Sequence, residues 1–420
     1  MLLSDLKKTI AQHIDTLAED AACVLMDLIH FPSVCGEEMG AVNCMKEVLL
    51  SAGFNPSIIP MNPEIKSHPE YTRYTIEPEW EGRGNLITVY GGNGKGKSLI
   101  LNAHIDVIPA KSWPDAFEPK RNDDIIIGRG ACDDKGGVVA GYVAMRALAE
   151  CGITTAGSLN LHIVIDEETG GNGTLSLLYN GHNADAAIVA ECTDNVICPA
   201  NRGALWFQLT TTGISTHMGE IDKGISAIEK ATRALDILKD YEHYLIENFM
   251  DHHYFQGLEH RPIQLCIGMI KAGEWPSMVP DHCEVEGGIG FLPNKDIDEV
   301  KYEMHQWIKE KGDTWLREHF NLRYDKLHNA AFEVASNHPF VTCMRAVAPE
   351  AGISSHIQGW PVSCDARLFP RVADMPVITI GPGKLEHAHS GNEQVKLSEI
   401  VKTAKLYAFT AIEWCGVEGM

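Results

Sequence analysis

Histidine and carboxylate side chains recur in this sequence where apolar runs end. NAHID ends one run and carries His104 and Asp106, while DEETGG ends another with Asp166, Glu167 and Glu168. Adjacent carboxylates repel one another unless cations neutralise them. Imidazole and carboxylate together form a donor set that suits zinc, and Asp106 is placed to orient the His104 ring. These two segments therefore indicate a metal site.

Three further groups extend the pattern. Asp133 and Asp134 lie in the glycine-flanked turn GRGACDDKGG, whose spacing fits neither a phosphate-binding loop nor a dinucleotide fingerprint. Glu191 ends the apolar run ADAAIVAECTD, and His389 lies in HAHSGNE after a glycine-rich strand end. Any one of these groups could be a packed histidine, a solvated turn or a surface acid. Taken together they predict two zinc ions, with cobalt or manganese as alternatives.

The elements around these residues alternate between strand and helix, which predicts a mainly parallel α/β sheet with helices on both faces. Ligands bind such sheets at the carboxyl ends of the strands, where the acids and His104 fall. The expected strands cover 98–110, 158–171, 184–194 and 376–383, and the expected helices cover 1–30, 37–53, 136–151, 174–180 and 338–352.

From Arg202 the pattern changes to β-α-β-β-α-β, the order of a small ferredoxin-like α+β sandwich. We therefore expect residues 203–328 to form an inserted second domain. The two parts of the catalytic domain are then 1–202 and 329–420.

Composition limits the classes of partner. The chain has 420 residues, enough for two domains, and a net charge of −22, which disfavours nucleic acid. It contains no apolar run of 18 residues and no signal peptide, so no membrane is expected. Its 12 cysteines are scattered without a CxxC pair, which predicts reduced thiols in a cytoplasmic protein.

Several motifs in this order resemble the zinc aminoacylase and carboxypeptidase family, which includes acetylornithine deacetylase, succinyl-diaminopimelate desuccinylase and glutamate carboxypeptidase. The resemblance runs from HFPSVCGEE to HSGNEQV and implies a di-zinc hydrolase of a small N-acyl amino acid or related amide. A dipeptidase or carboxypeptidase on the same scaffold is the alternative. From another class, a non-catalytic binding protein with a degenerate site is considered. The motifs are HIDVIP, GRGACDDKGG, DEETGG, AECTD, GISTHMG, SCDAR and HAHSGNE.

The resemblance also implies a role for each metal ligand. Asp133 is implied to bridge the two zinc ions, and the peptide bond that follows it is implied to be cis. His104 and Glu191 are the implied ligands of one zinc, and Glu168 and His389 of the other.

Other residues receive roles in turnover from the same resemblance. Glu167 is the implied general base. His217, in the inserted domain, is implied to reach the partner's site in a homodimer and bind the scissile carbonyl oxygen. Arg367 is implied to contact a substrate carboxylate. Ser277 and Gly290 occupy places where many relatives carry asparagine and arginine, so the resemblance does not identify the substrate.

Overall fold

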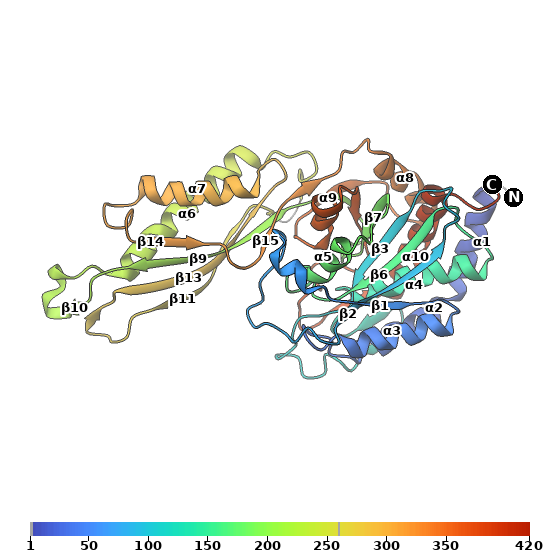
Figure 1. Cartoon of the computed structure of the whole chain (residues 1–420), viewed down its shortest axis with the longest axis horizontal. Coiled ribbons are helices and arrows are strands. Elements are labelled where there is room, and N and C mark those ends of the chain that lie inside the picture. Colours follow the sequence, from blue (N-terminus) through green and yellow to red (C-terminus); the bar gives the residue numbers. More distant parts are fainter. Residues whose placement is uncertain (1–2, 259–260) are drawn as a thin grey trace.

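The computed structural model describes residues 3–258 and 261–420, and it has two lobes joined side by side (Figure 1). Each lobe has a hydrophobic core of its own. The larger lobe contains both ends of the described chain, and the smaller lobe is built from the middle of the sequence (Figure 1).

A nine-stranded sheet runs through the larger lobe in the order β1-β2-β6-β3-β7-β18-β8-β16, with β17 beside β8. Its central strands β6, β3, β7 and β18 are parallel, which confirms the mainly parallel α/β sheet expected from the sequence. The strands are β1 Ser57–Pro60, β2 Gly84–Gly91, β3 Leu99–His104, β6 Ser158–Val164, β7 Ala186–Val189, β8 Ile197–Asn201, β16 Phe332–Glu333, β17 Ile357–Trp360 and β18 Val377–Thr379.

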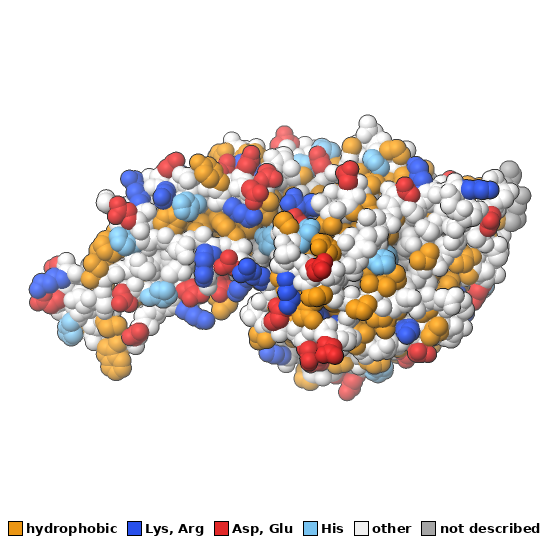
Figure 2. Space-filling view, viewed as in Figure 1, with side chains coloured by type: hydrophobic (Ala, Val, Ile, Leu, Met, Phe, Trp, Pro, Cys, Tyr) orange, Lys and Arg blue, Asp and Glu red, His pale blue; other side chains and the backbone are white. Residues whose placement is uncertain are grey.

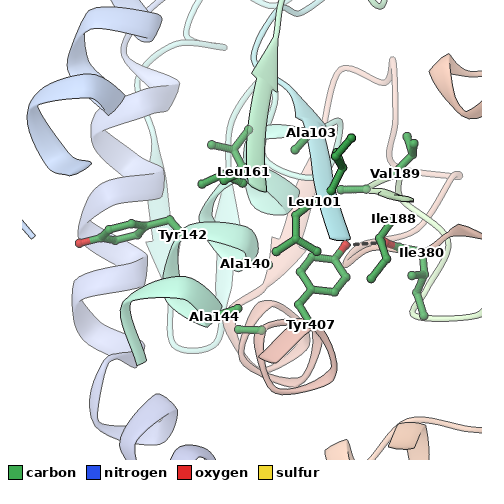
Figure 3. Close-up of a cluster of buried hydrophobic side chains, with 14 of the residues drawn as sticks. Leu101, Ala103, Ala140, Tyr142, Ala144, Leu161, Ile188, Val189, Ile380 and Tyr407 are labelled. Carbon is green, nitrogen blue, oxygen red and sulfur yellow. Dashed lines mark hydrogen bonds between the residues drawn. The ribbon is translucent and has the colours of Figure 1, made fainter. Parts of the chain in front are cut away.

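Helices cover both faces of this sheet, as expected. Figure 3 shows α4 (Lys135–Glu150) and α10 (Leu397–Cys415) packing their side chains against Leu101 and Leu161 of the sheet. The Tyr407 hydroxyl donates to the Ile380 carbonyl oxygen at 2.5 Å. On the opposite face, Asn102 Nδ2 donates to Thr174 Oγ1 of α5 at 3.1 Å. The remaining elements of this lobe are α1 Leu3–Thr16, α2 Ala18–Ile29, α3 Met39–Ser51, α5 Asn172–Tyr179, α8 Pro339–Val347, α9 Leu368–Ala373 and the small sheet of β4 Lys120–Asn122, β5 Ile125–Ile127 and β19 Gln394–Lys396.

The smaller lobe is an antiparallel sheet in the order β11-β13-β9-β14, with β15 also beside β9. Helices α6 and α7 cover one face of this sheet and leave the other face open (Figure 1). The β-α-β-β-α-β order is the one expected for a ferredoxin-like sandwich. The division at 203–328 remains our proposal for the domain boundary. The elements are β9 Gly203–Thr212, α6 Ala227–Phe249, β11 Leu265–Ala272, β13 His282–Phe291, α7 Ile297–Lys311, β14 Phe320–Arg323 and β15 His328–Asn329.

Two parts of the helical prediction differ from the structure. The single helix expected over 1–30 is wrong, because the described part divides at Leu17 into α1 and α2; residues 1–2 lie outside the described chain. Helix α10 was not foreseen, although it packs against α4 at the centre of the lobe. Across residues 3–258 and 261–420, no helix is long and apolar enough to cross a bilayer.

Candidate metal centre

Three neighbouring strands bring their carboxyl ends to one place in the larger lobe. His104 is the last residue of β3, and Glu167 and Glu168 follow the end of β6. Glu191 follows β7. Because β6, β3 and β7 are adjacent and parallel, these side chains converge at one edge of the sheet.

The converging side chains form two groups, each with one histidine and two carboxylates. Within each group the possible ligand atoms all lie within 4.8 Å of one another. The first group is His104, Glu167 and Glu191, and the second is Asp133, Glu168 and His389.

Asp133 joins the two groups. Its Oδ1 lies 3.0 Å from His104 Nε2, and its Oδ2 lies 3.3 Å from His389 Nε2. Burial acts to raise the pKa of Asp133, but the hydrogen bonds to the two histidines outweigh it and hold the pKa far below its usual value. The peptide bond to Asp134 is cis, as the resemblance implied. A carboxylate with one oxygen toward each histidine has the geometry of a bridging ligand.

Asp106 orients residues of both groups. His104 Nδ1 donates to the Asp106 carbonyl oxygen at 3.0 Å, which orients the ring with Nε2 toward Asp133. The Asp106 carboxylate lies 3.6 Å from the same ring nitrogen. It accepts the backbone N–H groups of Glu167 at 3.2 Å and Glu168 at 3.1 Å. Asp106 therefore fixes the turn that presents the two glutamates, in addition to the ring it was expected to support.

A buried ion-pair network holds the third acid of this turn away from the centre. Asp166 has a left-handed φ of 67°. This conformation costs free energy and persists only where the surrounding contacts enforce it. Arg83 Nη2 donates to Asp166 Oδ1 at 2.5 Å, and Tyr74 donates to Oδ2 at 2.5 Å. Arg83 Nε also donates to Glu38 Oε2 at 3.1 Å. Arg83 and Tyr74 lie outside every motif of the sequence analysis, and Glu38 ends HFPSVCGEE but was given no role there.

A second buried pair positions Asp133 and the His389 loop. Glu393 Oε1 accepts the backbone N–H groups of Cys132 and Asp133, both at 3.1 Å. Its Oε2 accepts a hydrogen bond from Arg129 Nη1 at 2.6 Å, while Arg129 Nη2 donates to the carbonyl oxygen of Ser390, next to His389. Glu393 belongs to HAHSGNE, so the motif contained it, but sequence analysis gave it no role.

The charge at the centre fits a pair of divalent cations. Burial raises the pKa of Glu167 and of Glu191 well above the usual value, and burial with the nearby Asp133 charge raises that of Glu168 to about 7. Four carboxylates so close together favour ionisation only beside positive charge. Two divalent cations would balance them, and imidazole with carboxylate is a suitable donor set. The His389 side chain is 52% exposed, so the centre is open on that side.

Residues 100–413 match the family described as Peptidase family M20/M25/M40. The chain belongs to this family. It is therefore a metallohydrolase that acts on amide bonds.

Relatives of this M20 chain include two named deacylases and a dipeptidase. The chain is 30% identical over 353 residues to N-formyl-4-amino-5-aminomethyl-2-methylpyrimidine deformylase of Bacillus subtilis (strain 168), covering 76% of this chain and 79% of that protein. It is 25% identical over 340 residues to acetylornithine deacetylase of Myxococcus xanthus, and the match covers 79% of this chain and 84% of that protein. The structure of the di-peptidase Dug1p from Saccharomyces cerevisiae matches with a TM-score of 0.76 at 16% identity. This match covers 97% of this chain and 98% of that chain and shows that the two share a fold.

Arg367 is engaged inside the M20 chain. Its side chain is 1% exposed, with Nη1 donating to Glu70 Oε2 at 2.6 Å and Nη2 donating to the Gly170 carbonyl oxygen at 3.0 Å. Glu70 also pairs with Arg371, so one carboxylate is shared by two guanidiniums, and the contact of Arg367 with a substrate carboxylate stays a prediction. The hydrogen bond from Arg367 to Gly170 anchors the glycine turn that follows Glu167 and Glu168.

His217 and Ser277 lie together, away from the metal centre. His217 is in β10 (Thr216–His217), which pairs with β12 (Met278–Val279) at the end of the smaller lobe farthest from the larger lobe (Figure 1). Met218 N donates to the Ser277 carbonyl oxygen at 2.9 Å. The M20 chain by itself therefore does not bring these two residues to the centre.

Glu393→Gln tests whether the Arg129 pair positions the metal ligands. The amide nitrogen that this substitution introduces would face the Arg129 guanidinium, so the pair would be lost and Asp133 less firmly held. We expect metal affinity, measured by chelator competition, to fall about 10–100-fold, as is usual for the loss of a residue that supports a ligand. Glu399→Gln is the control, because Glu399 accepts a backbone N–H from Gly383 and does not contact Asp133. Equal affinities in the two folded variants would contradict this role for Glu393.

Proposed function

We propose that this M20 enzyme uses two zinc ions to remove a short acyl group from a small N-acylated amine or amino acid. The arrangement of His104 and His389 on the two oxygens of Asp133, with Glu167 beside them, is the observation that carries the proposal. Cobalt and manganese remain alternatives to zinc. A homodimer and a cytoplasmic location belong to the same proposal.

The choice of a deacylase over a dipeptidase rests on the relatives. The deformylase and deacetylase are similar in sequence to this chain over three quarters of its length or more. The dipeptidase shares the fold at 16% identity and carries no argument about substrate. A dipeptidase or carboxypeptidase activity is therefore the second candidate. A non-catalytic protein is disfavoured because all six acids and histidines of the two groups are present.

In the proposed reaction, Glu167 acts as the proton carrier. It takes a proton from the attacking water and later gives it to the leaving amine. Two divalent cations held by the centre would polarise the acyl carbonyl and lower the pKa of that water. Asp106 keeps the His104 ring and the Glu167 backbone in place during these steps. The burial that raises the pKa of Glu167 suits a group that must both accept and donate a proton.

The proposed role of His217 is to donate a hydrogen bond to the scissile carbonyl oxygen. Its Nδ1 accepts the backbone N–H of Gly219 at 3.1 Å, so a neutral ring carries its proton on Nε2. The His217 Nε2–H group is therefore available as a hydrogen-bond donor at the outer end of the smaller lobe. Since that end is remote from the chain's own centre, the proposed recipient is the site of a second copy. Ser277, beside it, is proposed to line the same substrate pocket.

The adjacent glutamates should respond differently to substitution. Glu167→Gln should lower kcat by about 10²–10⁴, because the proton carrier is lost, while the metal content stays at two ions per chain. Glu168→Gln should reduce the metal content, because a ligand is lost. Metal analysis of the two purified variants gives the comparison, with each serving as the control for the other. Equal metal loss in both would assign Glu167 as a ligand.

Subunit mixing tests His217. His217→Ala should lose about 10²–10³ in kcat with its metal retained, while the exposed control His282→Ala should stay active. Mixing His217→Ala with Glu167→Gln chains should restore about a quarter of the wild-type activity, since half of the dimers then carry one complete site. Tagged chains establish that hybrids form. Hybrids without activity would show that His217 does not act on the partner's site.

A substrate panel tests the proposed class. The panel contains N-formyl-4-amino-5-aminomethyl-2-methylpyrimidine, N-acetylornithine, N-succinyl-diaminopimelate and dipeptides, assayed with zinc-loaded protein. We expect the formyl or acetyl compounds to exceed the dipeptides at least about tenfold in kcat/KM. The succinyl compound should be poor, because Ser277 and Gly290 stand where many relatives carry asparagine and arginine. Faster cleavage of dipeptides would favour the second candidate.

A further inference from the structure

The open face of the smaller lobe contains a cavity that is separate from the metal centre. Its volume is about 360 Å³, and it is lined by parts of β9, β11 and β13 and by residues 325–326. None of the histidines and carboxylates of the metal centre lines it. Helices α6 and α7 cover the opposite face of the sheet, so this face is free (Figure 1).

Two glycines of β13 shape the floor of the cavity. Gly288 and Gly290 line it, whereas a Cβ at Gly287 would lie 2.8 Å from buried Phe207 on the core side of the sheet. A Cβ at Gly288 would lie 3.1 Å from Trp206 Cδ1, and one at Gly290 would lie 2.6 Å from Arg202 Nη1. The indole and the guanidinium thus occupy room that side chains on β13 would otherwise fill.

The walls are mainly apolar and include one large aromatic ring. Trp206, directly opposite Gly288 in the β9–β13 pairing, is 49% exposed. Met269 and Cys266 of the edge strand β11 form the other side. Exposed indole and thioether groups beside a bare backbone floor are suited to contact with a planar ring.

Arg202 places a positive charge at one end of the cavity. Its Nη1 donates to the Pro262 carbonyl oxygen at 3.0 Å, and its Nε has no hydrogen-bond partner among the described residues. No carboxylate in residues 3–258 or 261–420 forms an ion pair with it, and burial lowers its pKa. By contrast, Lys326 at the other end is paired with Glu286 at 2.5 Å. A partly desolvated guanidinium without an acid favours an anionic partner.

The cavity also lies near the junction of the lobes, where Lys and Arg side chains gather in the middle of the molecule (Figure 2). Beyond Lys326, His328 Nε2 lies 2.9 Å from the Pro69 carbonyl oxygen of the larger lobe. Pro69 precedes Glu70, the partner of Arg367. The basic side chains in this region favour the approach of a small anion, against the −22 charge of the whole chain.

We propose that this cavity binds a planar, largely apolar molecule that carries one carboxylate. Its ring would lie against the exposed indole of Trp206, and its carboxylate would meet Arg202. This binding does not depend on the proposed hydrolysis, because no residue of the metal centre takes part.

The test uses 1-naphthoate and its neutral counterpart 1-naphthamide with the zinc-loaded full chain, by titration calorimetry. Naphthoate should bind at least about tenfold more tightly than naphthamide, because only its carboxylate forms a charge-assisted hydrogen bond with Arg202. Arg202→Gln should remove that difference, and Arg202→Lys should keep part of it. Gly288→Val, which suits a strand and fills the floor, should weaken both probes at least about tenfold.

Control variants distinguish binding in this cavity from binding at the metal centre or elsewhere on the sheet. Lys271→Gln and Thr210→Val alter charge and shape on the same sheet at residues that do not line the cavity, so both variants should bind the probes like the wild type. Glu168→Gln, which is expected to hold less metal, should bind naphthoate like the wild type, and binding that falls with its metal content would show coordination to metal instead. Equal binding of the two probes, or unchanged binding in Gly288→Val, would overturn the proposal. So would a Gly288→Val variant that changes only the oligomeric state in sedimentation, since the face would then serve contact between copies.

Discussion

The contact of Asp133 with two histidines is the constraint on which the larger lobe depends. One carboxylate can face both His104 and His389 only if β3, the turn between β5 and α4 and a C-terminal loop are held in fixed relative positions. The order β6-β3-β7 supplies the neighbouring acids at the same edge. The Glu393–Arg129 pair then fixes the Asp133 backbone and the loop next to His389 together. The distance between the two histidines is thus set by several contacts outside the centre itself.

The chain sorts its buried acids into two classes. Around the centre, buried carboxylates have arginine partners: Glu38 and Asp166 pair with Arg83, Glu393 with Arg129, and Glu70 with Arg367. Within the described residues, no arginine or lysine forms an ion pair with Asp133, Glu167, Glu168 or Glu191, and the ion pairs that Asp133 and Glu168 form are with histidine. Burying an unpaired charge costs several kcal/mol, so the first class is neutralised by protein. The acids of the second class have no such partner and would be neutralised by bound cations. The presence or absence of an arginine partner therefore separates the structural acids from the metal-facing ones.

The sequence predicted the central sheet and the grouping at its edge because both follow from local patterns. An apolar run that ends in acids places those acids at a strand end, and parallel strands then bring them together. The arginine pairs could not be found in this way. Arg83 and Glu38 are 45 positions apart, and Arg129 and Glu393 are 264 apart, with no shared motif. For Arg367 a motif suggested a substrate contact, but it could not show the buried Glu70 that Arg367 shares with Arg371. The helix break at Leu17 escaped because no proline or glycine marks it.

The two lobes differ in how their sequence encodes a site. In the larger lobe the chemistry depends on side chains that are present, and a motif can reveal them. In the smaller lobe the open face is shaped by side chains that are absent, because glycines on β13 leave room for Trp206 and Arg202. The proposed role of His217 likewise depends on a backbone contact. The Gly219 N–H donates to His217 Nδ1, so Nε2 of the neutral ring is the hydrogen-bond donor. Neither the glycines of β13 nor the tautomer of His217 can be recognised from a sequence motif. The effect of a glycine, and the nitrogen that carries the ring proton, depend on the groups that pack beside them. Substrate choice within one metal chemistry can therefore change through such positions while every metal-facing residue stays the same.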